Sequence, residues 1–174
     1  MTLSTVIPFM AIDEGKRQVL QDSVRKMRGY NELIIVSNWE KWYAKPINHG
    51  LKLATGDFLS VANDDLEWTG SMKQLCDENA VVSPSVNGQV QPFWGCAFVF
   101  PRWVYEKTGG LCEDYEVSYF DNDDFLMTLK KLGIKHYCNP QVNVNTKGGR
   151  TLDKFPNRNE FFEANKQKFE AKWL

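Results

Sequence analysis

The chain lacks the features that would place it in a membrane or on a nucleic acid. Its formal net charge is −1, and neither basic nor acidic residues form a long run. General attraction to nucleic acid or to a membrane surface is therefore not expected, although the composition allows a local basic face. No apolar stretch approaches the roughly 20 residues that a membrane-spanning helix needs, so we expect no membrane span.

Cysteine and histidine are too few and too scattered to suggest a zinc site. The four cysteines show no CxxC spacing, and only His49 and His136 could complete a set of ligands. We therefore expect four free thiols, as in a reducing compartment, rather than two disulfides. The N-terminus also lacks a basic segment followed by a long apolar stretch, so we expect no signal peptide and a cytoplasmic location.

The composition that is present is that of a folded globular protein. Of the 174 residues, 43% are hydrophobic and 13% are aromatic. This length can bury a substantial core, and no repeat, low-complexity tract or linker interrupts the chain. We therefore expect residues 1–174 to form one domain.

The first half alternates between short apolar runs and helical periodicity. Strands are predicted at Ser4–Ile7, Leu33–Val36 and Phe58–Ala62, and helices at about 14–28 and at Ala44–Leu53. Five such elements with short connections predict a βαβαβ unit with a parallel sheet. Open sheets of this kind bind ligands beyond the carboxyl ends of their strands.

The third predicted strand ends in two adjacent carboxylates, Asp64 and Asp65, preceded by Asn63. Two acids at a strand end repel each other unless a cation or a hydrogen-bonding ligand shares the site. Their oxygens suit Mg²⁺ or Mn²⁺ bound to a diphosphate. The alternative is an acidic turn in which Asp65 caps the next segment.

The second half carries another acidic cluster at the start of a predicted helix. Asp121, Asp123 and Asp124 fall within four residues, and the helix is expected to end near Leu132. Acids commonly cap helix N-termini, but three of them exceed what capping requires. Strand-like segments lie at Ala80–Pro84, Gly95–Phe100, Lys135–Asn139 and Val142–Val144. A last helix is expected at about 159–173, with its aromatic residues packed in the core.

These segments together resemble the nucleotide-sugar glycosyltransferases of GT-A fold, specifically those of family 2. The resemblance covers roughly residues 4–149 and depends on five motifs in the family's order. They are the first strand ending in Ile7-Pro8, the stretch Asn48–Phe58, the acid pair with Asn63, the segment Gly95–Pro101 followed by Gly109-Gly110-Leu111, and Phe120–Phe125 followed by Leu129, Leu132 and Gly133.

The resemblance implies a three-layer α/β/α sandwich with a mostly parallel central sheet. It also implies an enzyme that moves a sugar from a nucleotide-diphosphate sugar to an acceptor hydroxyl, with inversion and by direct displacement. A metal or fixed cations must then stabilise the departing diphosphate, and a general base must take the acceptor proton. The chain is short for the family, as some viral or phage enzymes are, and a viral origin would place it in the host cytoplasm.

The resemblance also assigns the metal ligand and the base. Asp65 is the metal ligand, and Asp64 is either a second ligand or a ribose contact, for Mn²⁺ or Mg²⁺. The candidates for the general base are Asp121, Asp123 and Asp124. The matching family position could instead be Asn122, which cannot accept a proton in this way.

Other site residues are assigned by position at the same edge of the sheet. The donor contacts are Pro8, Phe9, Ser37, Asn38, Lys45, Asn63, Asp64, Lys147 and Arg150. Phe9 would stack on the nucleobase or belong to the core, and Lys45 would contact the diphosphate or be solvated. Trp94 and Gly95 are assigned to the acceptor, with Trp94 as a platform for a sugar ring or as a core residue.

Two departures from the family bear on the donor site. Ser37-Asn38 replaces an acid that often contacts the base or ribose, so the identity of the nucleobase stays open. Asn145 stands where the family frequently has a histidine after its last core strand. The metal is then expected to bind weakly without the donor, with Lys147 or Arg150 partly neutralising the diphosphate.

Two other functions compete with sugar transfer. A nucleotidyltransferase also uses a parallel sheet and paired acids, but it normally has a glycine-rich, basic loop after the first strand. Here the loop Pro8–Gly15 has one glycine and no cation. The other alternative is a non-catalytic domain that binds a sugar or a partner. For a transferase, the sequence leaves the acceptor open among a saccharide, a protein and a modified nucleic-acid base.

Overall fold

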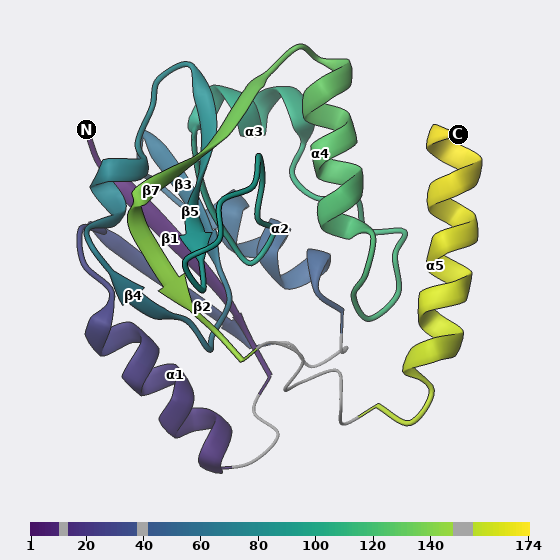
Figure 1. Cartoon of the computed structure of the whole chain (residues 1–174), viewed down its shortest axis with the longest axis horizontal. Coiled ribbons are helices and arrows are strands. Elements are labelled where there is room, and N and C mark those ends of the chain that lie inside the picture. The colour runs from purple at the N-terminus through teal and green to yellow at the C-terminus, as the bar shows by residue number, and fades with distance from the viewer. Residues whose placement is uncertain (11–13, 38–41, 148–154) are drawn as a thin grey trace.

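A computed structural model describes residues 1–10, 14–37, 42–147 and 155–174, with a central sheet covered by helices on both faces (Figure 1). The elements of these residues are β1 (Leu3–Phe9), α1 (Glu14–Lys26), β2 (Glu32–Ser37), α2 (Ala44–Leu53), β3 (Phe58–Ala62), β4 (Glu67–Thr69), the 3₁₀ helix η1 (Met72–Leu75), β5 (Ala80–Val86), β6 (Ala97–Pro101), α3 (Arg102–Thr108), α4 (Asp121–Lys131), β7 (Lys135–Asn145) and α5 (Arg158–Trp173). None of the described helices is both long and apolar enough to cross a membrane.

The strands form one seven-stranded sheet in the order β2-β1-β3-β6-β5-β7-β4. β1 pairs in parallel with β2 and β3, and β5 pairs in parallel with β7. β6 runs antiparallel to both β3 and β5, and β4 runs antiparallel to β7. Most described strands therefore share one direction, which confirms the predicted parallel start and the mostly parallel sheet.

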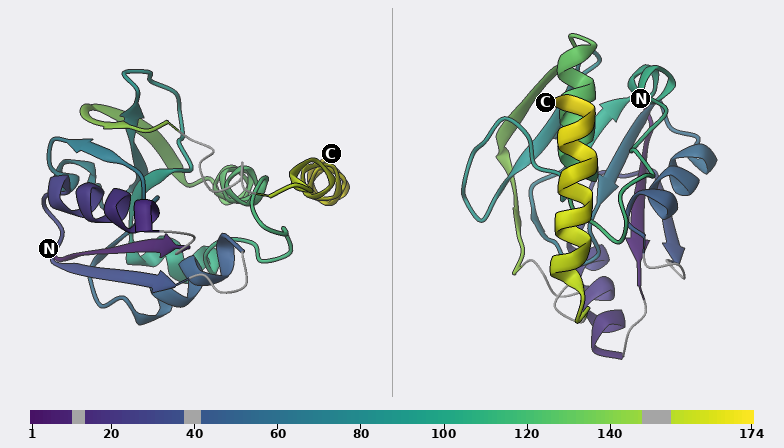
Figure 2. Two further views of the ribbon diagram at one scale, coloured as in Figure 1. Left: turned by 90° about the horizontal axis from the view of Figure 1, so that it is seen from below. Right: turned by 90° about the vertical axis from the view of Figure 1, so that its right-hand side faces the viewer.

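Alternating side chains of β1 enter two separate cores, one on each face of the sheet. Leu3 and Ile7 pack with a cluster that includes Leu20 of α1 and Met72 of η1. Val6, on the opposite face, packs with α2, α3 and α4. This alternation is the expected consequence of a strand covered on both sides. It confirms the predicted three-layer arrangement, which Figure 2 shows from two further directions.

Several strand boundaries differ from those that the sequence predicted, including those of β1 and β7. β1 does not stop before Pro8 but continues to Phe9, and both residues are buried. Pro8 is tolerated because β1 pairs with β3 only as far as Val6, which leaves Pro8 where β2 alone is paired with β1. β7 is one strand rather than two, and its pairing with β5 shifts register between Pro84 and Ser85.

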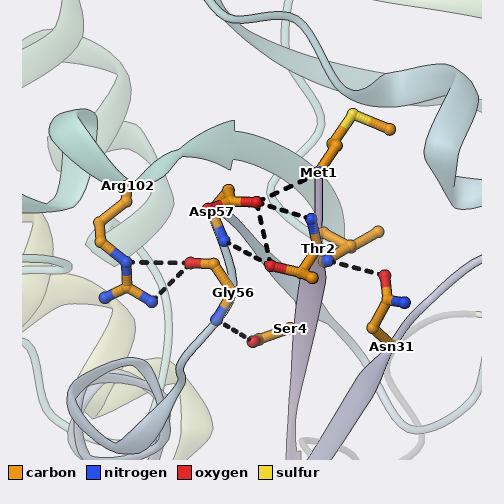
Figure 3. A network of polar contacts seen from close by, with 8 residues as sticks. Met1, Thr2, Ser4, Asn31, Gly56, Asp57 and Arg102 are labelled. Carbon is orange, nitrogen blue, oxygen red and sulfur yellow. Dashed lines mark hydrogen bonds and ion pairs between the residues drawn. The ribbon is translucent and has the colours of Figure 1, made fainter.

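The end of the stretch Asn48–Phe58, which resembles the family signature, forms hydrogen bonds at the N-terminal ends of the parallel strands (Figure 3). The carboxylate of Asp57 accepts hydrogen bonds from the backbone N–H of Thr2 (2.8 Å) and from its hydroxyl (3.1 Å). The N–H of Gly56 donates to the hydroxyl of Ser4 (2.7 Å), and Arg102 donates to the carbonyl of Gly56 (2.6 and 2.9 Å). These residues tie the turn before β3 to β1 and to the start of α3.

The C-terminal helix α5 stands beyond α4 and away from the sheet (Figures 1 and 2). The prediction that its aromatic residues pack in the core is wrong for two of them, because the rings of Phe162 and Phe169 lie against Phe120, in the loop before α4. Phe162 remains 38% exposed. The helix is therefore held by the loop before α4 and by Asp124 of α4.

Candidate functional site

The acid pair lies at the carboxyl end of β3, as the strand pattern predicted. Asn63 donates its backbone N–H to the carbonyl of Cys96 (2.9 Å), which fixes the exit of β3 against the chain just before β6. Asp64 is buried, with 8% of its surface exposed, and Asp65 is partly buried. The two carboxylates therefore follow β3 directly, at a turn that is hydrogen-bonded to the segment before β6.

Lys16 of α1 neutralises Asp64. Its Nζ lies 2.7 Å from Oδ1 of Asp64, and both side chains are buried. Burial raises the pKa of Asp64, and the charge and hydrogen bond of Lys16 oppose that rise. Sequence reasoning misses Lys16, because this residue follows directly after the loop Pro8–Gly15, which itself contains no cation.

Asp65 contacts the chain that leaves β7. The hydroxyl of Thr146 donates to Oδ2 of Asp65 (3.2 Å), and Thr146 is also held by the amide of Asn87. The exposed Lys147 follows directly, so it belongs to the same edge as the acid pair. Asn145, which replaces the family histidine, is the last residue of β7 and pairs with Glu67 of β4.

Asp121, the first residue of α4, is buried with 1% of its surface exposed. Its Oδ1 accepts the backbone N–H of Asn122 (2.8 Å), whereas its Oδ2 has no hydrogen-bond partner among the described residues. Burial raises the pKa of Asp121 to about 7, and the charge of Asp123 adds to the rise. A carboxyl group with such a pKa can accept a proton near neutral pH.

Tyr43, directly before α2, connects the two acidic clusters. Its hydroxyl donates to Oδ1 of Asn63 (2.7 Å), and the carbonyl of Gly95 is 3.3 Å away. Burial raises the pKa of Tyr43 strongly, and the negative charges of Asp121 and Asp64 raise it further. The tyrosine therefore stays protonated and shares its surroundings with both clusters. An aromatic residue before a helix has many structural uses, so no sequence pattern predicts this role of Tyr43.

Gly95 allows the two halves of the site to approach each other. A Cβ at this position would collide with the side chain of Asn122. The carboxamide oxygen of Asn122 is itself buried without a hydrogen-bond partner among the described residues. The close approach of the Asn122 side chain therefore requires a glycine at position 95.

The other two acids of the α4 cluster have different surroundings. Asp123 is exposed. Asp124 is buried, and its Oδ2 accepts from the hydroxyl of Tyr115 (3.0 Å), from Nε1 of Trp173 (2.7 Å) and from Nζ of Lys172 (2.8 Å). Three donors on one oxygen give Asp124 a structural role at α5, and they leave Asp121 as the candidate base.

The residues assigned to the donor by position are not all gathered at the acid pair. Phe9 packs in the core cluster of the α1 face, which favours its structural interpretation. Ser37 is exposed at the end of β2, and Nζ of Lys45 lies over the ring of Trp42, 4.1 Å from its centre. Asn38 and Arg150 lie outside the described residues.

Trp94, assigned to the acceptor, is partly buried against the same core cluster as Phe9. Its indole Nε1 is buried and has no hydrogen-bond partner among the described residues. A buried indole N–H usually finds a partner, so an acceptor oxygen of a bound molecule is one way to supply it. The neighbouring Phe93 belongs to the opposite core, where it packs against Phe98 and Phe125.

The described residues do not form a complete metal cage. No group of three His, Cys, Asp or Glu side chains that could hold a metal gathers in them. Of the two adjacent carboxylates, Asp64 is already paired with Lys16, which leaves Asp65 as the better ligand. Mg²⁺ and similar ions are commonly held by one or two carboxylates together with substrate phosphates. The donor set therefore fits an ion shared with a diphosphate.

Solved structures with the same arrangement of strands and helices are glycosyltransferases. The catalytic domain of Drosophila β1,4-galactosyltransferase 7 with xylobiose superposes with a TM-score of 0.59 at 14% identity. The mannosyltransferase PcManGT from Pyrobaculum calidifontis with GDP-Man and Mn²⁺ gives 0.61 at 16%, and TarS 1–349 from S. aureus with UDP gives 0.60 at 12%. The chain has a GT-A fold.

The match covers most of this chain but only part of its neighbours. It spans 84% of the present chain in all three cases, against 65%, 58% and 61% of the galactosyltransferase, the mannosyltransferase and TarS. No family model matches the sequence, and no curated protein matches it significantly. At these identities the GT-A likeness establishes the fold alone.

Proposed function

We propose that the protein is an inverting glycosyltransferase that moves a sugar from a nucleotide-diphosphate sugar to an acceptor hydroxyl. One observation supports the proposal most directly: Tyr43 is hydrogen-bonded to Asn63, next to the acid pair, and its pKa is raised by the charges of both Asp121 and Asp64. One cluster can face a diphosphate and the other can accept a proton. That separation of tasks is what a direct displacement needs.

Asp121 is the proposed general base. Its carboxylate takes the proton of the acceptor hydroxyl while that oxygen forms a bond to the anomeric carbon of the sugar. The bond between this carbon and the diphosphate oxygen breaks in the same step, and the electron pair leaves with the nucleoside diphosphate. A pKa near 7 suits this task, because about half of the base is then ionised at neutral pH and the carboxylate is still basic enough to accept a proton.

The donor side is proposed to use Asp65, Lys147 and the pair Lys16–Asp64. A bound Mn²⁺ or Mg²⁺ would be held by Asp65 and would stabilise the charge that develops on the leaving diphosphate. Lys147, exposed directly after Thr146, would add a positive charge at the same edge. With Lys16 neutralising Asp64, the edge repels a diphosphate less than two free carboxylates would.

We propose one domain over residues 1–174 in the cytoplasm, or in the host cytoplasm for a viral protein. The acceptor is proposed to be a saccharide, a protein or a modified nucleic-acid base. Trp94 is the proposed acceptor contact, because its indole N–H is buried without a partner among the described residues.

Lys16 also favours a second candidate, a nucleotidyltransferase. Such an enzyme needs a cation close to the first strand, and Lys16 in the first turn of α1 provides one. The two reactions differ in their products. A glycosyltransferase releases a nucleoside diphosphate from a nucleotide sugar, whereas a nucleotidyltransferase consumes a nucleoside triphosphate and a sugar phosphate and releases pyrophosphate.

A thermal-shift panel tests the proposal. UDP-, GDP-, CDP- and dTDP-sugars are each added with and without Mn²⁺, and at least one should raise the melting temperature because it binds only the native state. Asp65→Asn should lose the Mn²⁺-dependent part of the shift, and Asp22→Asn, an exposed acid on α1, should keep it. The proposal fails if no nucleotide sugar shifts the protein in either metal condition. Binding without release of nucleoside diphosphate to any acceptor class would indicate a non-catalytic domain.

A further inference from the structure

The loop that precedes the candidate base has a backbone conformation that its own residues disfavour. Val117, Tyr119 and Phe120 have φ angles of 64°, 76° and 66°, in the left-handed region. Such angles are uncommon for residues other than glycine, and they are strained for a β-branched residue such as Val117. Because Phe120 directly precedes α4, this backbone sets where Asp121 stands. Strain of this kind persists only where surrounding contacts hold it.

Asn165 of α5 provides contacts that hold the loop. Its side chain is completely buried, although most of α5 is exposed. Its Nδ2 donates to the carbonyls of Glu116 (2.8 Å) and Ser118 (2.9 Å), with the carbonyl of Tyr119 at 3.5 Å. Its Oδ1 accepts the backbone N–H of Glu116 (3.0 Å). One side-chain amide therefore satisfies backbone groups of the strained segment in both directions.

Further contacts of α5 reach the same segment and the first turn of α4. The ring of Phe120 packs against those of Phe162 and Phe169, with ring centres 5.2 and 5.4 Å away. At the C-terminal end of α5, Trp173 and Lys172 donate to Asp124, three residues after Asp121. Phe120 before Asp121 and Asp124 after it are thus both in contact with α5.

We propose that α5 is a clamp on the loop of residues 116–120, and that Asn165 is the positioning residue through which this clamp fixes Asp121. The role given to Asp121 rests on the proposed function, whereas the clamp itself does not. Without the amide of Asn165, the backbone groups of the loop lose their partners and the left-handed residues relax. Misplacement of a catalytic group by about 1 Å is enough to lower a rate roughly 100-fold.

The test compares Asn165→Ala with Asn159→Ala, an exposed asparagine on the same helix. Both substitutions make the same chemical change in α5, so a general effect on the helix would appear in both. In Asn165→Ala, amide hydrogen exchange of residues 116–121 should accelerate about tenfold or more, while exchange in the sheet stays unchanged. The turnover number should fall about 100-fold at an unchanged KM for the donor.

Trp173→Phe provides a second variant if Asn165→Ala does not fold. It keeps an aromatic ring at this position and removes one hydrogen-bond donor to Asp124. Exchange of residues 120–125 should therefore accelerate, and turnover should fall by a smaller factor than in Asn165→Ala. Unchanged exchange in the loop overturns the clamp, and faster exchange with unchanged turnover overturns the positioning role of Asn165. If the wild-type protein transfers no sugar from any donor, the proposed function fails instead, and hydrogen exchange alone decides the clamp.

Discussion

Polar and charged side chains lie at both ends of the strands of the central sheet, but they differ in how fully they are hydrogen-bonded. At the N-terminal edge, the side chains of Asp57, Ser4 and Arg102 each form a hydrogen bond with a neighbouring backbone segment (Figure 3). At the carboxyl edge, Asp121 keeps one oxygen buried without a partner among the described residues, and burial raises the pKa of Asp64. The satisfied polar groups at the N-terminal edge maintain the fold, whereas the unpartnered oxygen of Asp121 is available for chemistry.

The largest effect is expected for Asp121→Asn. The amide keeps the shape of the side chain but cannot accept the acceptor proton, so turnover should fall by about 10²–10⁴-fold. Thermal shifts by the nucleotide sugar should remain, because the donor is proposed to bind at the other cluster. A steady-state assay of nucleoside diphosphate release measures the change.

The same assay decides among the three acids of α4. Asp123→Asn, in which an exposed acid of the same turn is changed, should keep most of the turnover. A loss in Asp123→Asn combined with full activity in Asp121→Asn would transfer the role of base to Asp123.

Lys16→Met should have the largest effect on stability. It leaves the carboxylate of Asp64 buried without its cation, and such a change lowers the free energy of unfolding by about 3–5 kcal/mol. Urea unfolding measures the loss. The matched control is Lys26→Met on the same helix, whose exposed pair with Glu67 is expected to contribute less than about 1 kcal/mol.

The double variant Lys16→Met with Asp64→Asn separates the ion pair from packing. Removing the buried charge together with its partner should recover most of the lost stability, as expected for a coupled pair. If the double variant is no more stable than Lys16→Met alone, the loss comes from the packing of the lysine chain rather than from an uncompensated charge.

Stability should also depend on pH through Asp121. Its pKa is raised in the folded state, from 3.8 to about 7, so the native protein binds more protons than the unfolded chain between these values. The free energy of unfolding therefore falls as pH rises from about 4 to about 7 and is then constant, by up to about 4 kcal/mol at about 1.4 kcal/mol for each pKa unit.

Comparison with Asp121→Asn isolates this contribution from those of other carboxyl groups. Urea unfolding of both proteins at several pH values should show a difference that grows from about pH 4 to about pH 7, with the variant more stable above pH 7. A difference that does not change with pH would mean that Asp121 titrates normally in the folded protein.

The fold was predictable because its signals are local. The apolar runs of β2 and β3 and the helical spacing of α2 each fall within about ten residues, and the structure has these elements where they were expected. The motif Asn48–Phe58 was recognisable for a similar reason. Its Gly56 and Asp57 have fixed geometric tasks beside β1, which few other residues could perform.

The site was less predictable because its decisive contacts join distant segments. Lys16 meets Asp64 across 48 positions, Tyr43 meets Asn63 across 20, and Asp124 meets Trp173 across 49. The hydrophobic periodicity of helices and strands does not indicate such long-range pairs. Sequence patterns therefore predict the two acidic clusters. They do not predict that Asp64 is neutralised by a lysine, that Asp124 is bonded to α5, or that Asp121 is buried with an unpartnered oxygen.

The smallest effect is expected at the N-terminal edge, with Arg102→Met. The guanidinium donates to the carbonyls of Gly56 and Ala54, so its loss leaves these acceptors to water and should lower the free energy of unfolding by about 1–2 kcal/mol. Turnover and donor-induced thermal shifts should not change, because the site lies at the opposite edge. A large loss of turnover in a folded Arg102→Met protein would show that the two edges are coupled, and the contrast between a structural edge and a chemical edge would then be wrong.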